Sequence, residues 1–215
     1  MEDNRGYFEY KYGERVYMPE GIECIRGGSY EDFYDGDEDN PLFRVHIPKH
    51  VKRIEYRAFF GAHYLVTVTF EEGSFLDKIE SMAFSSCERL EKFEFTKLKY
   101  LHTIDIEAFS GAGLKNIDLS KCTCLRVVGD EAFSYNKNLV SVSWQPVAYV
   151  VPHGCFVECT NLHSFKGDDS YNGKYLEYIG GYAFSGCYNI EEFKITGACK
   201  IGMGNYELEK FTDKI

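Results

Sequence analysis

A small residue followed by phenylalanine recurs at nearly constant intervals, and this periodicity constrains the fold more than any other feature of the chain. The small residues of the six pairs are Ala58, Ala83, Ala108, Ala132, Cys155 and Ala183. The intervals between them are 25, 25, 24, 23 and 28 residues. Such a period is typical of a solenoid, in which each copy forms one turn and buries its apolar side against the next.

Other positions keep the same spacing relative to the small residue. Four residues before it stand Ile54, Ile79, Ile104, Val128, Val151 and Ile179. Three residues further back stand Val51, Leu76, Leu101, Leu125, Ala148 and Leu176. Four residues after it stand Ala62, Cys87, Ala112, Asn136, Cys159 and Cys187. Seven residues after it stand Leu65, Leu90, Leu139, Leu162 and Ile190, whereas Leu114 arrives one residue early.

Apolar residues follow two different spacings within each copy of the repeat, and these spacings predict two kinds of local structure. The turns close on alternating apolar residues, as in Val68 and Phe70 or Phe93 and Phe95, and this period of two predicts a short strand. The fifth turn keeps Phe165 but has Gly167 in the second place. The A-F-x-x-C segment has a spacing of three to four, which predicts a helical turn or a short 3-10 segment.

The combined pattern resembles the BspA-like (Treponema pallidum-type) leucine-rich repeats. Their mark, I-x-x-x-A-F-x-x-C-x-x-L, is present from Ile79 to Leu90 and, with Ile in the last place, from Ile179 to Ile190. The departures are the replacement of Cys by Ala or Asn in three turns and the single strand-following proline, Pro48. The resemblance implies a leucine-rich-repeat solenoid of six full turns plus caps, with stacked parallel strands on one side and short helical or 3-10 turns on the other. It also implies adhesion, and host or matrix binding on microbial surfaces.

The ends of the chain are expected to cover the hydrophobic ends of the solenoid. We expect residues 1–41 to form a β-rich cap that is partly loop, residues 42–202 to form the solenoid, and residues 203–215 to form a capping helix. Leu208, Phe211 and Ile215 fall at helical spacing in that last segment. The acidic stretch 32–40 and the insertion 166–174 are expected to be exposed loops.

Eight cysteines and six histidines offer candidate chemistry, but the repeat explains most of them. Cys122 and Cys124, or Cys155 and Cys159, have a spacing that could suggest zinc ligands. Packed thiols are favoured, because Cys87, Cys159 and Cys187 share a small-residue position. We expect Cys122 and Cys124, which flank a loop, to be the exposed pair.

A cysteine nucleophile and a calcium loop are the other candidate sites in the sequence. His153 lies two residues before Cys155, but Cys155 occupies the alanine position and is expected to be buried, so a nucleophile is disfavoured. An acidic run beginning at Asp35 resembles the start of a calcium loop. It has Asn40 at the sixth position and His46 at the twelfth, where such a loop needs glycine and glutamate. We therefore expect no catalytic centre, metal site or cofactor.

Charge and hydropathy limit the partners. The net charge of -10 argues against nucleic acid and gives some preference for basic partners. No apolar stretch is long enough to insert into a membrane, and the first residues do not read as a signal peptide. The cytoplasm is therefore the default location, while the family resemblance points to the cell surface; the sequence leaves this and the oligomeric state open.

The outward positions of the predicted strands are the main candidate site for a protein partner. They comprise His46, Thr67, Thr69, Lys92, Glu94, Asn116, Asp118, Ser141, Ser143, Lys166 and Lys194, with Arg44, Ser164 and Glu192 in the same columns. Solenoids hold extended partners on such a face. The alternative, that any outward face is polar simply because it meets water, stays open. Both an adhesin and an intracellular scaffold or signalling adaptor could use this face.

Overall fold

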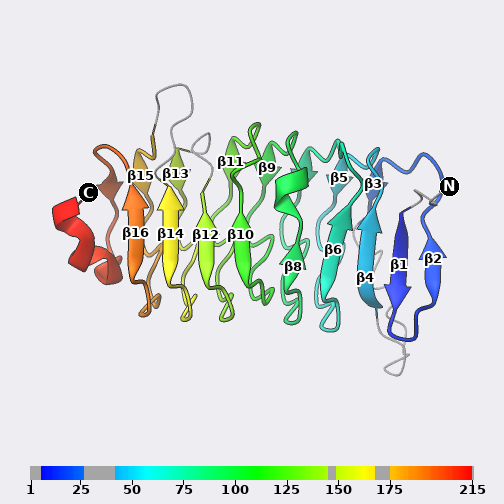
Figure 1. The fold of residues 1–215 in the computed structure, drawn as a ribbon, viewed down its shortest axis with the longest axis horizontal. Helices are drawn as coiled ribbons and strands as arrows, with labels where there is room; N and C mark the ends of the chain where they lie inside the picture. Colours follow the sequence, from blue (N-terminus) through cyan, green and yellow to red (C-terminus); the bar gives the residue numbers. More distant parts are fainter. Residues whose placement is uncertain (1–5, 27–41, 145–148, 168–174, 215) are drawn as a thin grey trace.

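The repeat forms a solenoid, as the sequence predicted. The computed structural model describes residues 6–26, 42–144, 149–167 and 175–214; Ala148, Ile215, the acidic stretch 32–40 and most of the insertion lie outside these ranges. Two rows of short strands run along a rod (Figure 1), with the amino and carboxyl ends of the chain at opposite ends. We call them the front row and the rear row.

The front row consists of the predicted closing strands. They are β4 (Leu42–Ile47), β6 (Thr67–Phe70), β8 (Lys92–Phe93), β10 (Asn116–Asp118), β12 (Ser141–Ser143), β14 (Ser164–Gly167) and β16 (Glu192–Ile195). Neighbours pair in parallel at equivalent positions of the repeat, for example Val45 with Val68 and Val142 with Phe165. The ladder is interrupted once, between β8 and β10.

The interruption lies between the closing strands of the second and third turns. After Phe93 the chain leaves the strand, and Phe95–Lys97 forms the 3-10 helix η1, so the strand expected to include Phe95 ends early. Phe95 is nevertheless buried and packs edge-on against Phe109. In the next turn Leu114 arrives one residue early because the loop before it is shorter there.

The rear row is a second set of strands that the period-two pattern did not predict. Each has two residues and includes the aliphatic position four residues before the small residue. They are β3 (Cys24–Ile25), β5 (Arg53–Ile54), β7 (Lys78–Ile79), β9 (Thr103–Ile104), β11 (Val127–Val128), β13 (Val150–Val151), β15 (Tyr178–Ile179) and β17 (Lys200–Ile201). They pair in parallel within two sheets, one from β3 to β11 and one from β13 to β17; for example, Ile54 pairs with Ile79 and Ile79 with Ile104. Two residues are too few to produce a recognisable alternation.

The A-F-x-x-C segment differs in detail from the prediction, because it consists of consecutive β-turns rather than a helical or 3-10 turn. In the first turn Ala58 N donates to Glu55 O, and Ala62 N donates to Phe59 O. Two positions per copy have a positive φ, one directly before the small residue and one three residues after it. Those residues are Arg57, Gly61, Met82, Ser86, Glu107, Gly111, Glu131, Tyr135, Gly154, Glu158, Tyr182 and Gly186.

These left-handed residues let alternate N–H groups point along the rod, where they donate to the next turn. Phe59 N donates to Ala83 O at 2.8 Å, and Phe84 N donates to Ala108 O at the same distance. The flanking positions do the same, as where Gly61 N donates to Ser85 O at 2.9 Å. A helical segment would direct its N–H groups to its own carbonyls, so the β-turns allow the turns to bond to one another.

Beneath this backbone ladder the phenylalanines form a continuous stack. The rings of Phe59, Phe84, Phe109, Phe133, Phe156 and Phe184 follow one another with centroids 4.9 to 5.8 Å apart and interplanar angles of 6 to 26°. The small residue beside each ring is fully buried. Each large aromatic side chain adds strongly to the buried apolar area, and a stacked neighbour adds roughly 0.5–1.5 kcal/mol beyond that area.

Caps cover the solenoid at both ends. At the amino end β1 (Tyr7–Tyr10) pairs antiparallel with β4 and with β2 (Arg15–Tyr17), and Phe8 packs on Phe59. At the carboxyl end the segment Tyr206–Lys214 forms the 3-10 helix η2, which places buried Leu208 and Phe211 over the last turn (Figure 1).

The carboxyl-terminal cap also ends the axial ladder. In the last turn Tyr182 N donates to Met203 O, Phe184 N to the Asn205 side-chain oxygen, and Gly186 N to a carboxylate oxygen of Glu207. The Asn205 amide in turn donates to the carbonyls of residues 180 and 202. Two side chains thus take the place of a seventh turn's carbonyls.

We predict that Asn205→Ala lowers the free energy of unfolding by about 2–3 kcal/mol, because it leaves the buried Phe184 N–H without a partner and removes one hydrogen bond from each of two carbonyls. Urea denaturation followed by circular dichroism measures the change. Asn161→Ala is the control, since Asn161 is exposed and donates only to Lys137 O. An equal loss in the two variants would contradict the capping role.

We also predict that Gly111→Ala lowers the free energy of unfolding by about 1 kcal/mol through backbone conformation alone. Gly111 has φ +65°, and an added Cβ would meet no atom closer than 4.0 Å. Gly111→Asn is the matched variant, since asparagine tolerates the left-handed region and should cost less. Equal stability of the alanine variant and the parent in urea denaturation would refute this account.

Candidate protein-binding face

The outward side of the front row places the predicted binding residues on one surface, which we call the strand face. The pairing register aligns them in two columns. One runs through Arg44, Thr67, Lys92 and then Asn116, Ser141, Ser164, Glu192; the other runs through His46, Thr69 and then Asp118, Ser143, Lys166, Lys194. Glu94 lies just beyond β8, where η1 begins. Their role in binding remains a prediction.

The amino-terminal part of this face carries aromatic side chains that the repeat pattern could not reveal. The Tyr7 ring stacks on the His46 imidazole with centroids 5.4 Å apart, and Tyr17 meets Tyr7 edge-on. His46 Nδ1 lies 2.9 Å from Thr69 Oγ1. Burial, followed by the charge of Lys97, lowers the pKa of His46, so the imidazole is neutral at pH 7. Tyr7 and Tyr17 come from the antiparallel cap, which lies outside the repeat.

Ion pairs recur along the strand face in clusters of two cations around one carboxylate. Glu9 is 2.7 Å from Arg15 and 3.1 Å from Arg44. Glu94 is 3.1 Å from Lys92 and 3.4 Å from Lys97, and it also accepts a hydrogen bond from Phe70 N. The third carboxylate belongs to Glu192.

Glu192 lies between two lysines at the carboxyl-terminal part of the face. Its carboxylate is 2.6 Å from Lys194 Nζ and 3.6 Å from Lys166 Nζ, and it accepts a hydrogen bond from Ser164 Oγ. The hydrogen bonds from Lys194 and Ser164 lower the pKa of Glu192 to about 2. This carboxylate therefore stays ionised at every physiological pH.

Between the charged clusters the face is lined by small polar side chains. Ser141 Oγ donates to Asn116 Oδ1 at 2.8 Å, and Ser143 lies beside Asp118 in the register. These short side chains leave a low central stretch between Lys92 of β8 and Lys166 of β14. An extended chain could lie close to the backbone there.

Five of the eight cysteines are buried in the core. The expectation that Cys122 is exposed was wrong, because its side chain is fully buried and its Sγ donates to Phe95 O; burial raises its pKa to about 12. The reason is that Cys122 follows buried Leu119 and fills the space beneath η1. Cys124 is half-buried. Cys155 is fully buried with a pKa raised well above that of an ordinary thiol, so it is not a thiolate at neutral pH.

Cysteines at the repeat position after the β-turns have a structural partner. Cys87 donates to Phe59 O, Cys159 to Phe133 O and Cys187 to Phe156 O, at 3.0 to 3.3 Å. Asn136 occupies the same position and donates to Phe109 O at 2.7 Å. The position therefore requires a small side chain, and where that side chain is Cys or Asn it also donates to a carbonyl of the preceding turn.

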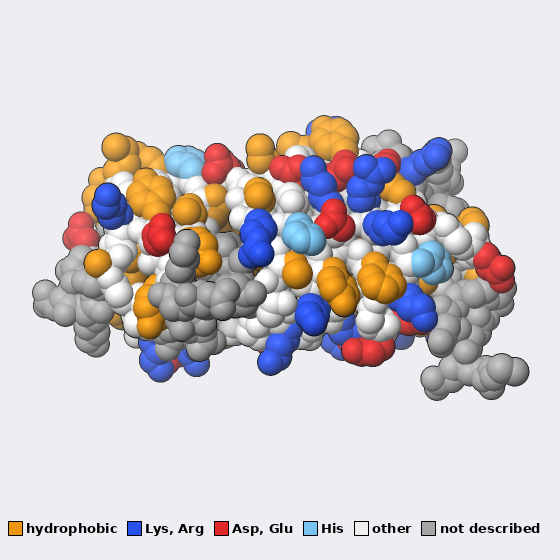
Figure 2. All heavy atoms as spheres, turned by 90° about the horizontal axis from the view of Figure 1, so that it is seen from above, with side chains coloured by type: hydrophobic (Ala, Val, Ile, Leu, Met, Phe, Trp, Pro, Cys, Tyr) orange, Lys and Arg blue, Asp and Glu red, His pale blue; other side chains and the backbone are white. Residues whose placement is uncertain are grey.

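The remaining surface differs from the strand face. Within the described ranges no three His, Cys, Asp or Glu side chains are grouped to hold a metal ion, and no helix is long and apolar enough to cross a membrane. Figure 2 shows the edge formed by the segments that follow the front-row strands, where cations, carboxylates and scattered hydrophobic side chains alternate. A single-sign patch is not visible on it.

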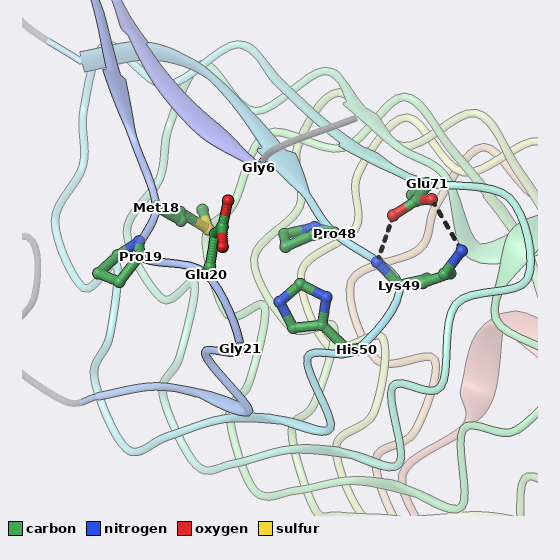
Figure 3. Close-up of a pocket in the computed structure, with 9 residues that line it drawn as sticks. All are labelled: Gly6, Met18, Pro19, Glu20, Gly21, Pro48, Lys49, His50 and Glu71. Carbon is green, nitrogen blue, oxygen red and sulfur yellow. Dashed lines mark hydrogen bonds and ion pairs between the residues drawn. The ribbon is translucent and has the colours of Figure 1, made fainter. Parts of the chain in front are cut away.

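A cavity of about 300 Å³ lies between the amino-terminal cap and the first turn (Figure 3). Its walls include Met18, Glu20, Pro48 and His50. Glu71 is engaged there by Lys49, whose backbone N donates to it at 3.0 Å and whose Nζ lies 3.3 Å away. Lys49 and Glu71 thus pair with each other, whereas the buried Nε2 of His50 has no hydrogen-bond partner among the described residues.

Comparison with known proteins agrees with this architecture. The model of the family described as BspA type leucine rich repeat region (6 copies) matches residues 37–121 and 98–207. A crystal structure of a leucine-rich-repeat protein from T. pallidum is 27% identical, covers 68% of this chain and 64% of its own, and has a TM-score of 0.57. The chain thus spans slightly less than two thirds of that protein.

Two further crystal structures are similar at lower identity. A leucine-rich-repeat protein from Bacteroides ovatus is 18% identical over 76% of this chain and 63% of its own, with a TM-score of 0.40. The pneumococcal vaccine antigen PcpA is 18% identical over 80% of this chain and 38% of its own, with a TM-score of 0.46. A search of curated proteins found no match. Since the family match extends over most of the sequence, the chain belongs to the BspA-type leucine-rich-repeat family.

Proposed function

We propose that this chain is a protein-binding module that holds an extended segment of its partner along the strand face. The observation that supports this most directly is the register of the front row. Outward side chains of equivalent repeat positions lie side by side along the rod, with short polar residues in the middle and longer charged residues toward both ends. Solenoids use such repeated surfaces to bind extended partners.

The rigidity of the face favours this function. Every outward position is attached to a backbone that hydrogen-bonds to its neighbours, and the side chain on its other side is buried in the core, as Val68 and Val142 are. A surface fixed in this way loses little conformational entropy when a partner binds. Adhesion at a microbial surface and scaffolding inside the cell would both use it, and localisation of the protein in its own cell separates the two.

We predict that Thr67→Glu combined with Ser143→Arg abolishes capture of the partner, because one long side chain on β6 and another on β12 obstruct the strand face while the net charge is unchanged. The measurement is affinity capture from the source cells with quantitative mass spectrometry. Thr103→Glu with Ser81→Arg, on the rear side of the rod, is the matched control. Retention of every partner by the strand-face variant would show that binding occurs elsewhere.

A further inference from the structure

Local charge on the strand face is opposite in sign to that of the whole chain. The described outward side chains of this face include six cations and four carboxylates, a net charge of +2. The cations are Arg15, Arg44, Lys92, Lys97, Lys166 and Lys194, and the carboxylates are Glu9, Glu94, Asp118 and Glu192. The complete chain carries -10.

The arrangement of these charges directs the positive groups outward. In each of the three clusters one carboxylate lies between two cations, so each cluster has a net charge of +1. The three carboxylates are 11 to 37% exposed, whereas the six cations are 35 to 62% exposed. Each carboxylate holds its two cations in place, and the Lys97 ammonium is held further by a hydrogen bond to Phe70 O.

We infer that the strand face binds an acidic polypeptide segment in extended conformation. This inference rests on the proposed function and names the chemistry of its partner. It reverses the preference for basic partners that net charge alone indicates, because a bound chain meets the local potential of the face rather than the average of the molecule.

The spacing of the clusters matches a short segment of chain. From β4 to β16 there are six steps between neighbouring strands, or roughly 29 Å at about 4.8 Å per step. An extended polypeptide advances about 3.3 Å per residue, so roughly nine residues would reach from the first cluster to the third. Acidic residues near both ends and near the middle would each meet one cluster.

A polypeptide fits this surface better than a nucleic acid does. The positive groups occur in isolated clusters, with Asp118 and neutral Asn116, Ser141 and Ser143 between the second and the third. A nucleic acid presents closely spaced phosphates throughout its length, so several of them would lie over the stretch that carries Asp118 and no cation. The neutral central stretch instead offers hydroxyl and amide groups that can hydrogen-bond a peptide backbone.

The experiment measures binding of a fluorescein-labelled peptide of about ten residues, alternating glutamate and glycine, by fluorescence anisotropy at about 20 mM and about 150 mM salt. The full chain is expected to bind this peptide at least roughly tenfold more tightly than the peptide in which lysine replaces glutamate, with weaker binding at the higher salt. The combined variant Lys92→Gln, Lys166→Gln and Lys194→Gln is expected to lose roughly tenfold or more in affinity for the acidic peptide.

The matched control carries Lys52→Gln, Arg53→Gln and Lys78→Gln. These cations lie off the strand face and are also paired with carboxylates, and their removal changes the net charge equally. It should bind the acidic peptide within about twofold of the parent. Far-ultraviolet circular dichroism of both variants establishes that each is folded.

Three results would overturn the inference. They are equal affinity for the acidic and lysine peptides, equal loss in the two variants, and tighter binding of a thymidine oligonucleotide or a heparin oligosaccharide of matched charge. Failure of the inference about an acidic partner can be distinguished from failure of the proposed protein-binding function. If the Thr67→Glu and Ser143→Arg variant still loses its cellular partners, the face binds protein and only the acidic class of partner is wrong.

Discussion

Hydrogen bonds that run along the rod from one turn to the next are the interaction on which the rest of this structure depends. Every copy contributes them from the β-turns beside the Ala-Phe pair, where residues of positive φ rotate alternate N–H groups toward the following turn. Glycine occupies only some of these positions, so residues such as Met82 and Tyr135 accept an unfavourable backbone conformation. The bonds between turns, and the phenylalanine stack they align, offset that cost.

The hydrogen bonds along the rod end at the carboxyl end, where side chains accept from N–H groups that would otherwise donate to the carbonyls of a seventh turn. The amide oxygen of Asn205 and the carboxylate of Glu207 accept from the last two β-turn donors, while η2 covers the exposed apolar surface. At the amino end the cap is different, since an antiparallel hairpin pairs with β4 and lays Phe8 on the phenylalanine stack. The hairpin also brings Tyr7, Glu9 and Arg15 onto the strand face. Capping therefore contributes directly to the candidate site.

Buried and outward residues alternate within each front-row strand, and this alternation explains why the strand face can carry function. Alternate residues such as Val142 and Phe165 are buried and determine stability, which leaves their neighbours unconstrained by packing. The outward residues differ from turn to turn, from threonine to lysine to serine, although the inward ones repeat. The clusters around Glu9, Glu94 and Glu192 are thus local arrangements with a sign opposite to that of the whole molecule.

The sequence by itself determined the solenoid, its six turns, the buried columns and the two outward columns of the strand face, because each depends on a short period that repeats. It also determined that the cysteines at the Cys87, Cys159 and Cys187 position are packed thiols. Tertiary structure decided what depends on contacts between distant segments. The two-residue rear strands are too short to have a period, η1 breaks the front row and buries Cys122, and the β-turns take the place of a helical turn. The position of the cap tyrosines on the strand face and the charge clusters likewise depend on strands that are far apart in sequence and lie side by side. The repeat period does not reveal which charged side chains of neighbouring strands come into contact.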